Sequence, residues 1–276
     1  MKANWKFAIV ALATLAMVAC NPNKSTEPDK PQQQDTTVTP PAPQDTTVTP
    51  PPSGPFKSKI SVTDNSSADW ENVPAEYLVE SECPDDAMYL GLKWAKIYAD
   101  AAFINILVAY DPDELGEDLS WIPFHVYLDV DNDPTTGGFN GQLSEGNADV
   151  LLETGILADG AHNPWNPSVS KWWGDGVSNE WIWSDPSKDH DASDFWGAEV
   201  GEGQLPIGNS QELEGNIFEI QLMRELIPHE FANEFGLALD IQDAGWSSVG
   251  MIPQGSATDD GAVYGPILKI KIDPAK

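Results

Sequence analysis

Cysteine is scarce in this chain, because Cys20 and Cys83 are the only two among 276 residues. Two cysteines cannot build the framework of several disulfides that stabilises many small secreted domains, so the fold must depend on a hydrophobic core. Cys83 precedes a proline in an acidic stretch and has no histidine nearby in sequence. An incidental thiol is therefore a better interpretation of Cys83 than a catalytic nucleophile.

Positive charge is also scarce. Lysine and arginine together number 14, against 44 acidic residues, and the formal net charge is −30. Arg224 is the only arginine, and we expect it to pair with a carboxylate beside a strand. A surface this acidic repels nucleic acids and anionic membranes. We therefore expect no nucleic-acid partner, and membrane contact only through an N-terminal lipid.

Motifs of common catalytic sites are missing as well. The chain has no Gly-x-Ser-x-Gly elbow, no phosphate-binding loop and no dinucleotide fingerprint. Its histidines are scattered without the spacing of metal ligands: His125, His162, His190 and His229. Acidic residues are abundant, but no pair stands out as the acid and base of a glycosidase. The sequence thus favours a binding protein over an enzyme, and a polysaccharide-active enzyme stays open as an alternative.

Long hydrophobic runs are confined to the N-terminus. Lys2 and Lys6 precede a short apolar run from Phe7 to Val18, followed by a small residue and Cys20. This run is too short to span a bilayer and is typical of a signal peptide. Residues 1–20 resemble a bacterial lipoprotein signal, which implies lipidation of Cys20 and a location at the cell envelope, at the outer membrane or cell surface. An ordinary secretory signal with an incidental cysteine is the alternative.

A spacer and one domain follow the predicted signal. Residues 21–56 are rich in Pro, Thr, Gln and Asp and contain a near-duplication of the sequence DTTVTPP. Such a segment cannot bury enough apolar area to offset its ordering entropy, so we expect a disordered or polyproline-like linker. Residues 57–276 contain no second linker and are expected to form a single domain.

The pattern within this domain predicts strands almost throughout. At residues 124–130, Phe124, Val126 and Leu128 alternate with His125 and Tyr127, as expected for a strand with one face in a core. A short helix is expected at residues 224–235, ended or confined by a proline. We predict an all-β, jelly-roll-like antiparallel β-sandwich with one short helix and a Trp-rich hairpin insertion. Further strands are predicted at 92–99, 103–110, 149–154, 217–222, 237–242 and 266–272.

One loop carries a specific chemical signal. Asp129, Asp131 and Asp133 are three carboxylates within five residues, and Gly137 and Gly138 allow the chain to reverse after them. Carboxylates this close repel one another unless a cation or hydrogen bonds compensate. Hard oxygen ligands suit Ca²⁺, and Asp149 at the start of the next strand could complete a structural calcium site. An Asx-type turn without a metal is the alternative.

Tryptophan is concentrated in one part of the domain. The segment from Ser170 to Trp183 predicts a β-hairpin, with Trp181 and Trp183 on one face and one of Trp172 and Trp173 opposite them. These four indoles could offer flat platforms to the C–H face of a sugar, or could form a small core under the hairpin. The tryptophans elsewhere in the domain are expected to be mostly core: Trp70, Trp94, Trp121 and Trp246.

The loop and its neighbours also carry a family resemblance. Residues 127–138 (YLDVDNDPTTGG) and 146–153 (GNADVLLE) resemble the core of family 9 carbohydrate-binding modules and the related DOMON-like sandwiches. Three further segments agree with that family in order: Ala68–Pro74, Leu92–Ile106 and Phe218–Leu226. The resemblance implies a β-sandwich, often with calcium, that binds sugar ends between aromatic side chains. Residues 156–209 depart from the family pattern, and with its N-terminus the chain is similar to surface lipoproteins of Bacteroides-type bacteria.

The sequence therefore supports three hypotheses of function. The favoured one is a noncatalytic, membrane-anchored lipoprotein that binds a glycan and holds calcium structurally. The second is a structural or adhesive surface module with a protein partner. The third is the polysaccharide-active enzyme already mentioned.

Overall fold

The computed structural model describes residues 58–138, 147–172, 183–184, 207–227, 230–254, 257–258, 261–262 and 265–274. The chain divides into two compact units, Met1–Pro50 and Pro51–Lys276, and every described residue belongs to the second. The predicted signal peptide, Cys20 and the whole predicted linker lie outside the described residues, as do Trp173 and Trp181. The predictions about these parts therefore stay predictions.

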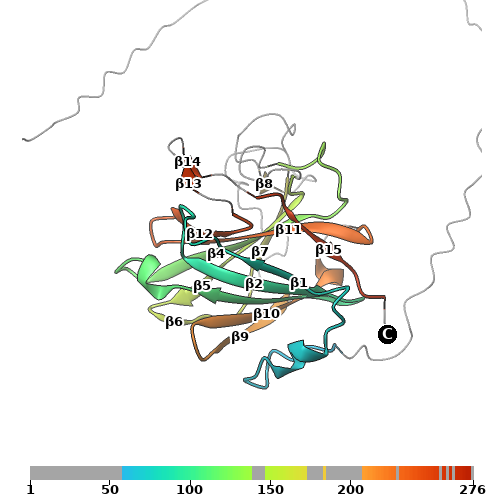
Figure 1. Ribbon diagram of the computed structural model, residues 1–276, viewed down its shortest axis with the longest axis horizontal. Coiled ribbons are helices and arrows are strands. Elements are labelled where there is room, and N and C mark those ends of the chain that lie inside the picture. Colours follow the sequence, from blue (N-terminus) through green and yellow to red (C-terminus); the bar gives the residue numbers. More distant parts are fainter. Residues whose placement is uncertain are drawn as a thin grey trace, which may run out of the picture. The chain divides into compact units, whose positions relative to one another are not determined.

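Two antiparallel sheets form the described domain (Figure 1). The five-stranded sheet has the order β1-β2-β3-β10-β9: Val79–Glu82, Leu92–Ala99, Phe103–Tyr110, Ile217–Met223 and Gly208–Leu213. The eight-stranded sheet has the order β12-β11-β4-β5-β7-β8: Ser248–Ile252, Glu234–Gln242, Trp121–Asp129, Val150–Ala158, Ser168–Trp172 and Trp183–Ser184. In the same sheet, β15 (Leu268–Lys271) pairs with β11, and β6 (Ala161–His162) pairs with β5. A separate small pair consists of β13 (Ala257–Thr258) and β14 (Gly261–Ala262).

The main hydrophobic core lies between the two sheets, as in a β-sandwich. On β4, alternate residues Phe124, Val126 and Leu128 are fully buried in this core, as the period of two predicts. Strands β3 and β10 supply Ile106 and Phe218 from the opposite sheet. The predicted all-β sandwich is confirmed, and β2 and β3 have the predicted bounds.

Where the structure describes it, the segment predicted to be helical forms only a 3₁₀ turn at Arg224–Leu226, and β11 begins at Glu234. Among the described residues Arg224 forms no ion pair with a carboxylate, although its charge acts on the Asp100 carboxyl: its Nη1 donates to the backbone carbonyl of Asp100 at 2.7 Å, and its guanidinium lies over the Phe231 ring. The arginine thus ties the strand end to the β2–β3 turn. Two further 3₁₀ turns occur at Ala68–Asn72 (η1) and Pro112–Glu114 (η2).

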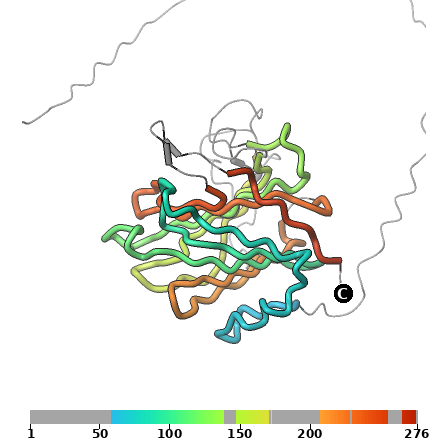
Figure 2. Tube along the Cα trace, viewed as in Figure 1, coloured from blue at the N-terminus to red at the C-terminus, as the bar shows by residue number. Residues whose placement is uncertain are grey.

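The N-terminal segment of the described domain covers the outer face of the five-stranded sheet. It is drawn in blue in Figure 2. Ile60 and Trp70 pack there against Tyr98 and Leu107 in a small cluster of buried residues. The cover includes a polar contact, because the Trp70 Nε1 donates to Oε1 of the buried Glu219 at 2.5 Å. Within the part of the chain that the structure describes, no helix has the length and apolar character needed to cross a membrane.

Candidate functional site

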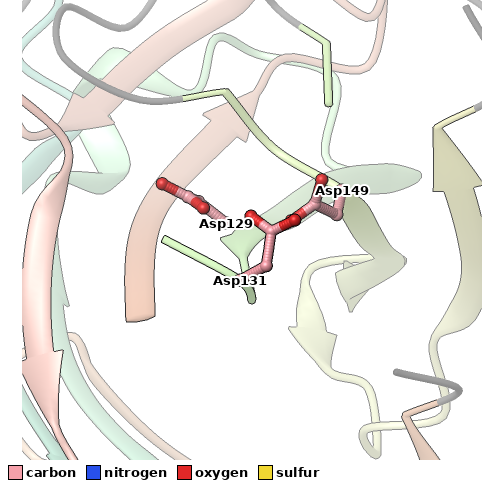
Figure 3. A group of neighbouring side chains, drawn as sticks. All are labelled: Asp129, Asp131 and Asp149. Carbon is pink, nitrogen blue, oxygen red and sulfur yellow. The ribbon is translucent and has the colours of Figure 1, made fainter. Parts of the chain in front are cut away.

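Three of the four predicted metal ligands come together at one end of β4. Asp129 is the last residue of β4, Asp131 follows it in the loop, and Asp149 immediately precedes β5 (Figure 3). One carboxylate oxygen from each lies within 4.8 Å of the others. Asp129 and Asp149 are buried and Asp131 is exposed, so the group is accessible from solvent on one side.

Glycines make room for this cluster. Gly236 lies opposite Asp129 in the β11–β4 register, where an added Cβ would come within 2.8 Å of the Asp129 Cβ. Gly137 has a φ of +71°, and an added Cβ would come within 2.5 Å of the Ala148 carbonyl oxygen and 3.0 Å of the Asp149 Oδ1. A side chain at either position would push these groups apart. The Gly137 reversal predicted from the sequence is therefore a requirement of the site.

Burial and nearby negative charge make the Asp129 and Asp149 carboxylates costly to keep ionised. Burial, followed by the charges of Asp131 and Asp129, raises the pKa of Asp149 to about 7. Burial also raises the pKa of Asp129, although the Lys269 ammonium, with Nζ at 3.3 Å from Oδ2, opposes this rise. Three carboxylates and one ammonium leave the cluster with an excess of negative charge when all are ionised.

The donor set fits a hard cation. Every candidate ligand atom is an oxygen, and the Thr136 Oγ1 lies 3.1 Å from Asp131 Oδ2 and 3.5 Å from Asp149 Oδ1. The Oδ1 of Asp129, a residue with no exposed surface, has no hydrogen-bond partner among the described residues. A buried carboxylate oxygen without a partner is costly, and a bound cation would satisfy it. The cluster could therefore hold a metal ion.

The fourth predicted ligand, Asp133, lies outside this group. Its Oδ1 accepts hydrogen bonds from the backbone N of Thr135 at 2.9 Å and from the Thr135 hydroxyl at 2.6 Å. Asp131 Oδ1 likewise accepts from the backbone N of Asp133 at 2.9 Å. The Asx-turn alternative is thus present in the same loop as the cluster, and a ligand role for Asp133 stays a prediction.

The predicted Trp-rich hairpin is described only at its base. In the register of β7 and β8, Trp172 lies directly opposite Trp183. Trp172 is half-buried and packs against a satellite cluster on the outer face of the eight-stranded sheet, made up of Tyr127, Ala148, Leu151, Ala238 and Ile267. Trp165, at the start of the Trp-rich part, is buried in the main core. Binding of a ligand by Trp172, Trp173, Trp181 and Trp183 stays a prediction.

Two tryptophans expected in the core are instead on the surface. Trp121 is 39% exposed and Trp246 is 50% exposed, whereas Trp70 is buried as expected. The Trp121 indole lies over Gly155 of β5, where an added Cβ would come within 2.4 Å of the ring. Trp246 lies in the β11–β12 turn with a φ of +64°, which is uncommon for a bulky residue. The prediction failed because Trp121 is the first residue of a strand and Trp246 lies in a turn, where alternation does not decide burial.

Sequence analysis also missed a buried polar cluster on the same outer face. His125 of β4 lies between carboxylates from both neighbouring strands: its Nε2 is 2.8 Å from Glu153 Oε2 and its Nδ1 is 3.8 Å from Asp240 Oδ2. The Tyr127 hydroxyl lies 3.0 Å from the His125 Nδ1. On β11, Gln242 Nε2 donates to Asp240 Oδ2 at 2.8 Å. We call His125, Glu153, Asp240 and Gln242 the polar cluster.

The polar cluster has more acceptors than donors. Asp240 is 2% exposed, and its Oδ2 accepts from Gln242 and from the Ser248 hydroxyl at 3.0 Å. Its Oδ1 and the Oε1 of Gln242 have no hydrogen-bond partner among the described residues. Burial, partly opposed by His125, raises the pKa of Asp240 to about 6. The cluster reaches the surface at the Glu153 side chain, which is 13% exposed, and at the half-buried Ser248.

The exposed tryptophans belong to this region of the fold. Gly155 lies two residues beyond Glu153 on β5, so the Trp121 indole covers the same face of the sheet that carries Glu153 and His125. Trp246 lies in the turn between Gln242 and Ser248, both of which contact Asp240. The only signal in the sequence was the alternation on β4, which places His125 and Tyr127 on the face away from the core.

Comparisons with known proteins do not identify a family for this chain. No protein-family model matches the chain, and no curated protein matches it. One similar solved structure is a family 9 carbohydrate-binding module from Caldicellulosiruptor kristjanssonii in complex with cellotriose. It has 12% sequence identity and a TM-score of 0.36, over 80% of this chain and 92% of that chain. A likeness this distant says nothing of the ligand, which has to be argued from the residues above.

Proposed function

We propose that this protein is a noncatalytic carbohydrate-binding module, and that it binds a saccharide at the polar cluster on the outer face of the eight-stranded sheet. The observation that carries the proposal is a pair of buried acceptors, Asp240 Oδ1 and Gln242 Oε1, that have no hydrogen-bond donor among the described residues. Leaving such acceptors unsatisfied costs roughly 1–3 kcal/mol each, more for a charged group. Saccharide hydroxyls supply the missing donors, and hydrogen bonds to an ionised carboxylate are the stronger kind.

The surroundings of the polar cluster suit a sugar. A pyranose presents apolar C–H faces as well as hydroxyls, and the exposed indole of Trp121 offers a flat apolar surface on the same face of the sheet. Trp246 offers a second indole from the adjoining turn. The Ser248 Oγ and the Gln242 Nε2 donate to the same oxygen of Asp240, so the half-buried Ser248 marks the side from which a saccharide hydroxyl would approach the polar cluster.

The test of saccharide binding is calorimetric titration of the full chain with a panel of soluble plant, bacterial and host oligosaccharides. We expect at least one to bind the wild type, with an affinity that Asp240→Asn weakens strongly. The matched control is Asp243→Asn in the neighbouring turn, a carboxylate that bonds only to its own turn backbone among the described residues. Absence of binding across the panel, or equal binding by Asp240→Asn, contradicts the proposal.

In this proposal Asp129, Asp131 and Asp149 hold a structural calcium ion. The support is the all-oxygen donor set and the unpartnered, buried Oδ1 of Asp129. Calcium would compensate the repulsion between carboxylates that lie at the junction of the 131–138 loop with β4 and β5. A ligand that binds only the folded state stabilises it by about 2.7 kcal/mol at one hundred times its Kd. We therefore expect millimolar Ca²⁺ to raise the Tm of the EDTA-treated chain.

Calorimetry with Ca²⁺ separates the candidate ligands. Asp131→Asn, at an exposed position, should weaken Ca²⁺ binding at least tenfold without loss of folding. Glu117→Gln removes one charge from another exposed loop and should leave the affinity unchanged. Asp133→Asn decides whether the fourth predicted residue is a ligand. Absence of heat with the wild type, together with an unchanged Tm, contradicts the calcium site.

The location of the module is part of the proposal. A lipid on Cys20 would hold the protein at the cell envelope, and residues 21–56 would serve as a spacer between the lipid and the domain. The support is the N-terminal sequence, with its two lysines, short apolar run and cysteine. Mass spectrometry of the mature protein should find a lipidated N-terminal cysteine, and Cys20→Ala should release the protein from the membrane fraction. A soluble wild-type protein contradicts the anchor.

A further inference from the structure

The cation cluster and the polar cluster are joined by a continuous line of contacts along the outer face of the eight-stranded sheet. Asp129, Tyr127 and His125 are alternate residues of β4, so they share that face. Between the two clusters lies the satellite cluster around Tyr127, with the half-buried Trp172 packed against it. Each contact along this line is given below.

The first contacts lead from the cation cluster to Trp172. The backbone N of Trp172 donates to the carbonyl oxygen of Asp149 at 2.8 Å, so a candidate ligand residue holds the end of β7. Gly138, at the end of the loop that begins with Asp131, exchanges two backbone hydrogen bonds with Ala148 at 2.8 and 3.0 Å. The Trp172 indole lies directly on Gly138, where an added Cβ would come within 2.3 Å of the ring.

The next contacts lead from Trp172 to the polar cluster. Trp172 packs against the satellite cluster, whose buried members include Tyr127, Ala148 and Leu151. Tyr127 is fully buried, and its hydroxyl lies 3.0 Å from the Nδ1 of His125. The two rings are perpendicular, with centroids 5.8 Å apart. The Tyr127 hydroxyl is therefore one of the groups that contact the His125 imidazole, which lies between Glu153 and Asp240.

From these contacts we propose that cation binding at Asp129, Asp131 and Asp149 controls saccharide binding at the polar cluster, through Trp172 and Tyr127. The part of this inference that concerns saccharide binding rests on the proposed function. A cation holds the 131–138 loop against Ala148 and Asp149. This fixes the positions of Gly138 and Ala148, which together form the surface against which the Trp172 indole packs. Without the cation, repulsion between the carboxylates lets Gly138 and Ala148 move apart. Trp172 and Tyr127 then no longer hold His125 in one position. Linkage requires the effect to be reciprocal, so the saccharide raises the affinity for the cation by the same factor.

Gly138→Ala tests this line without altering a carboxylate, because its Cβ would displace the Trp172 ring. Trp172→Phe is the second variant, which keeps the loop unchanged and removes most of the contact with Gly138. Both variants are checked for folding by far-ultraviolet circular dichroism. Asp131→Asn serves as the variant with an impaired cation cluster, and Glu117→Gln as its charge-matched control.

The first readout needs no saccharide. The full chain, labelled with ¹⁵N-histidine and treated with EDTA, is titrated with CaCl₂, and the ring signals of His125 are assigned by comparison with His125→Gln. We expect these signals to shift with the Kd found by calorimetry in the wild type and to stay unchanged in Gly138→Ala and Trp172→Phe. An unmoved His125 in the wild type, or an equal shift in both variants, overturns the proposal. Absence of Ca²⁺ binding to the wild type also overturns it, because the line then has no effector.

The second readout uses the saccharide found with the panel. We expect at least a tenfold difference in saccharide Kd between Ca²⁺ and EDTA for the wild type, and less than a twofold difference for Gly138→Ala and Asp131→Asn. Equal saccharide affinity of the wild type in Ca²⁺ and EDTA overturns the coupling and leaves the saccharide site intact. If no saccharide binds in either condition, the proposed function fails, and the histidine titration alone decides whether the two clusters communicate.

Discussion

Each of the two sheets has a buried carboxylate on its outer face, but the two carboxylates differ in how many of their oxygens accept hydrogen bonds. On the five-stranded sheet, both oxygens of Glu219 accept hydrogen bonds, one from Trp70 Nε1 and one from Gln211 Nε2. On the eight-stranded sheet, Asp240 has one oxygen with donors and one without a partner among the described residues. A buried carboxylate with both oxygens satisfied is explained by the fold alone. One that lacks a donor needs a further partner, and this contrast identifies the face on which we place the ligand.

The two carboxylates also contact different parts of the fold. Glu219 joins the N-terminal segment to the sheet, since Trp70 belongs to η1 and the Asn65 backbone donates to Gln211. Asp240 contacts residues of β4, β11 and β12, and the surface beside it carries two exposed indoles. Substitutions at Glu219 should therefore affect stability, and substitutions at Asp240 should affect binding.

The largest expected effect is that of Glu219→Ala. It leaves two buried donors, the Trp70 indole and the Gln211 amide, without acceptors, and each costs about 1–3 kcal/mol. We expect the free energy of unfolding to fall by about 3 kcal/mol, measured by urea denaturation, with saccharide affinity within twofold of the wild type. Unchanged stability would show that the N-terminal segment does not depend on this contact.

The opposite result is expected for Asp240→Asn. Removing the charge should weaken saccharide binding about 100-fold, equivalent to about 2.7 kcal/mol, because a charge-assisted acceptor is lost. Stability at neutral pH should be unchanged or higher, since a buried charge is removed. Calorimetry and thermal unfolding measure the two quantities on the same samples. Loss of stability with unchanged binding would reverse the roles assigned to the two faces.

Trp121→Ala should have a smaller effect on binding. Loss of the indole platform should weaken saccharide binding about 10- to 30-fold, the effect of removing a moderate contact residue. Met88→Ala is the control, because Met88 is a large apolar side chain, 43% exposed, that lies outside the proposed site. Equal affinities of the wild type and Trp121→Ala would exclude this indole from the site.

The smallest effect is that of pH. The pKa of Asp240 is raised to about 6, so most of the carboxylate is protonated at pH 5 and ionised at pH 7. Saccharide affinity should fall about tenfold between pH 7 and pH 5, with no such fall in Asp240→Asn. The stability that this group contributes changes with pH in the opposite direction to the saccharide affinity. It is greatest below the usual pKa of an aspartate and is lost as pH rises through about 6. An affinity that does not change with pH would mean that the carboxylate takes no part.

The sequence predicted those features that depend on local pattern. The alternation on β4 predicted both the buried face of Phe124 and Val126 and the opposite face of His125 and Tyr127. The spacing of Asp129 and Asp131 before a glycine turn predicted the loop in which the carboxylates gather. Asp149 was recognised because the loop between it and Asp133 returns to the same end of the sheet.

The features that the sequence did not predict depend on contacts between segments that are distant in the chain. Nothing near His125 indicates that Asp240 of β11 will lie beside it, because the pairing of β4 with β11 is set by the whole sheet. Trp121 and Trp246 are large aromatic residues of the kind common in cores, but Trp121 is the first residue of β4 and Trp246 lies in a turn. Strand ends and turns are where periodicity is least informative, and both indoles of the candidate saccharide surface lie there.

The most direct test of the account is the pKa of the Asp240 carboxyl, measured by ¹³C NMR with and without the saccharide found with the panel. If saccharide hydroxyls donate to its unsatisfied oxygen, binding favours the ionised form, and the pKa should fall by at least one pH unit from about 6 in the free protein. A pKa that is the same with and without saturating saccharide would contradict the claim that Asp240 receives its missing donor from a sugar.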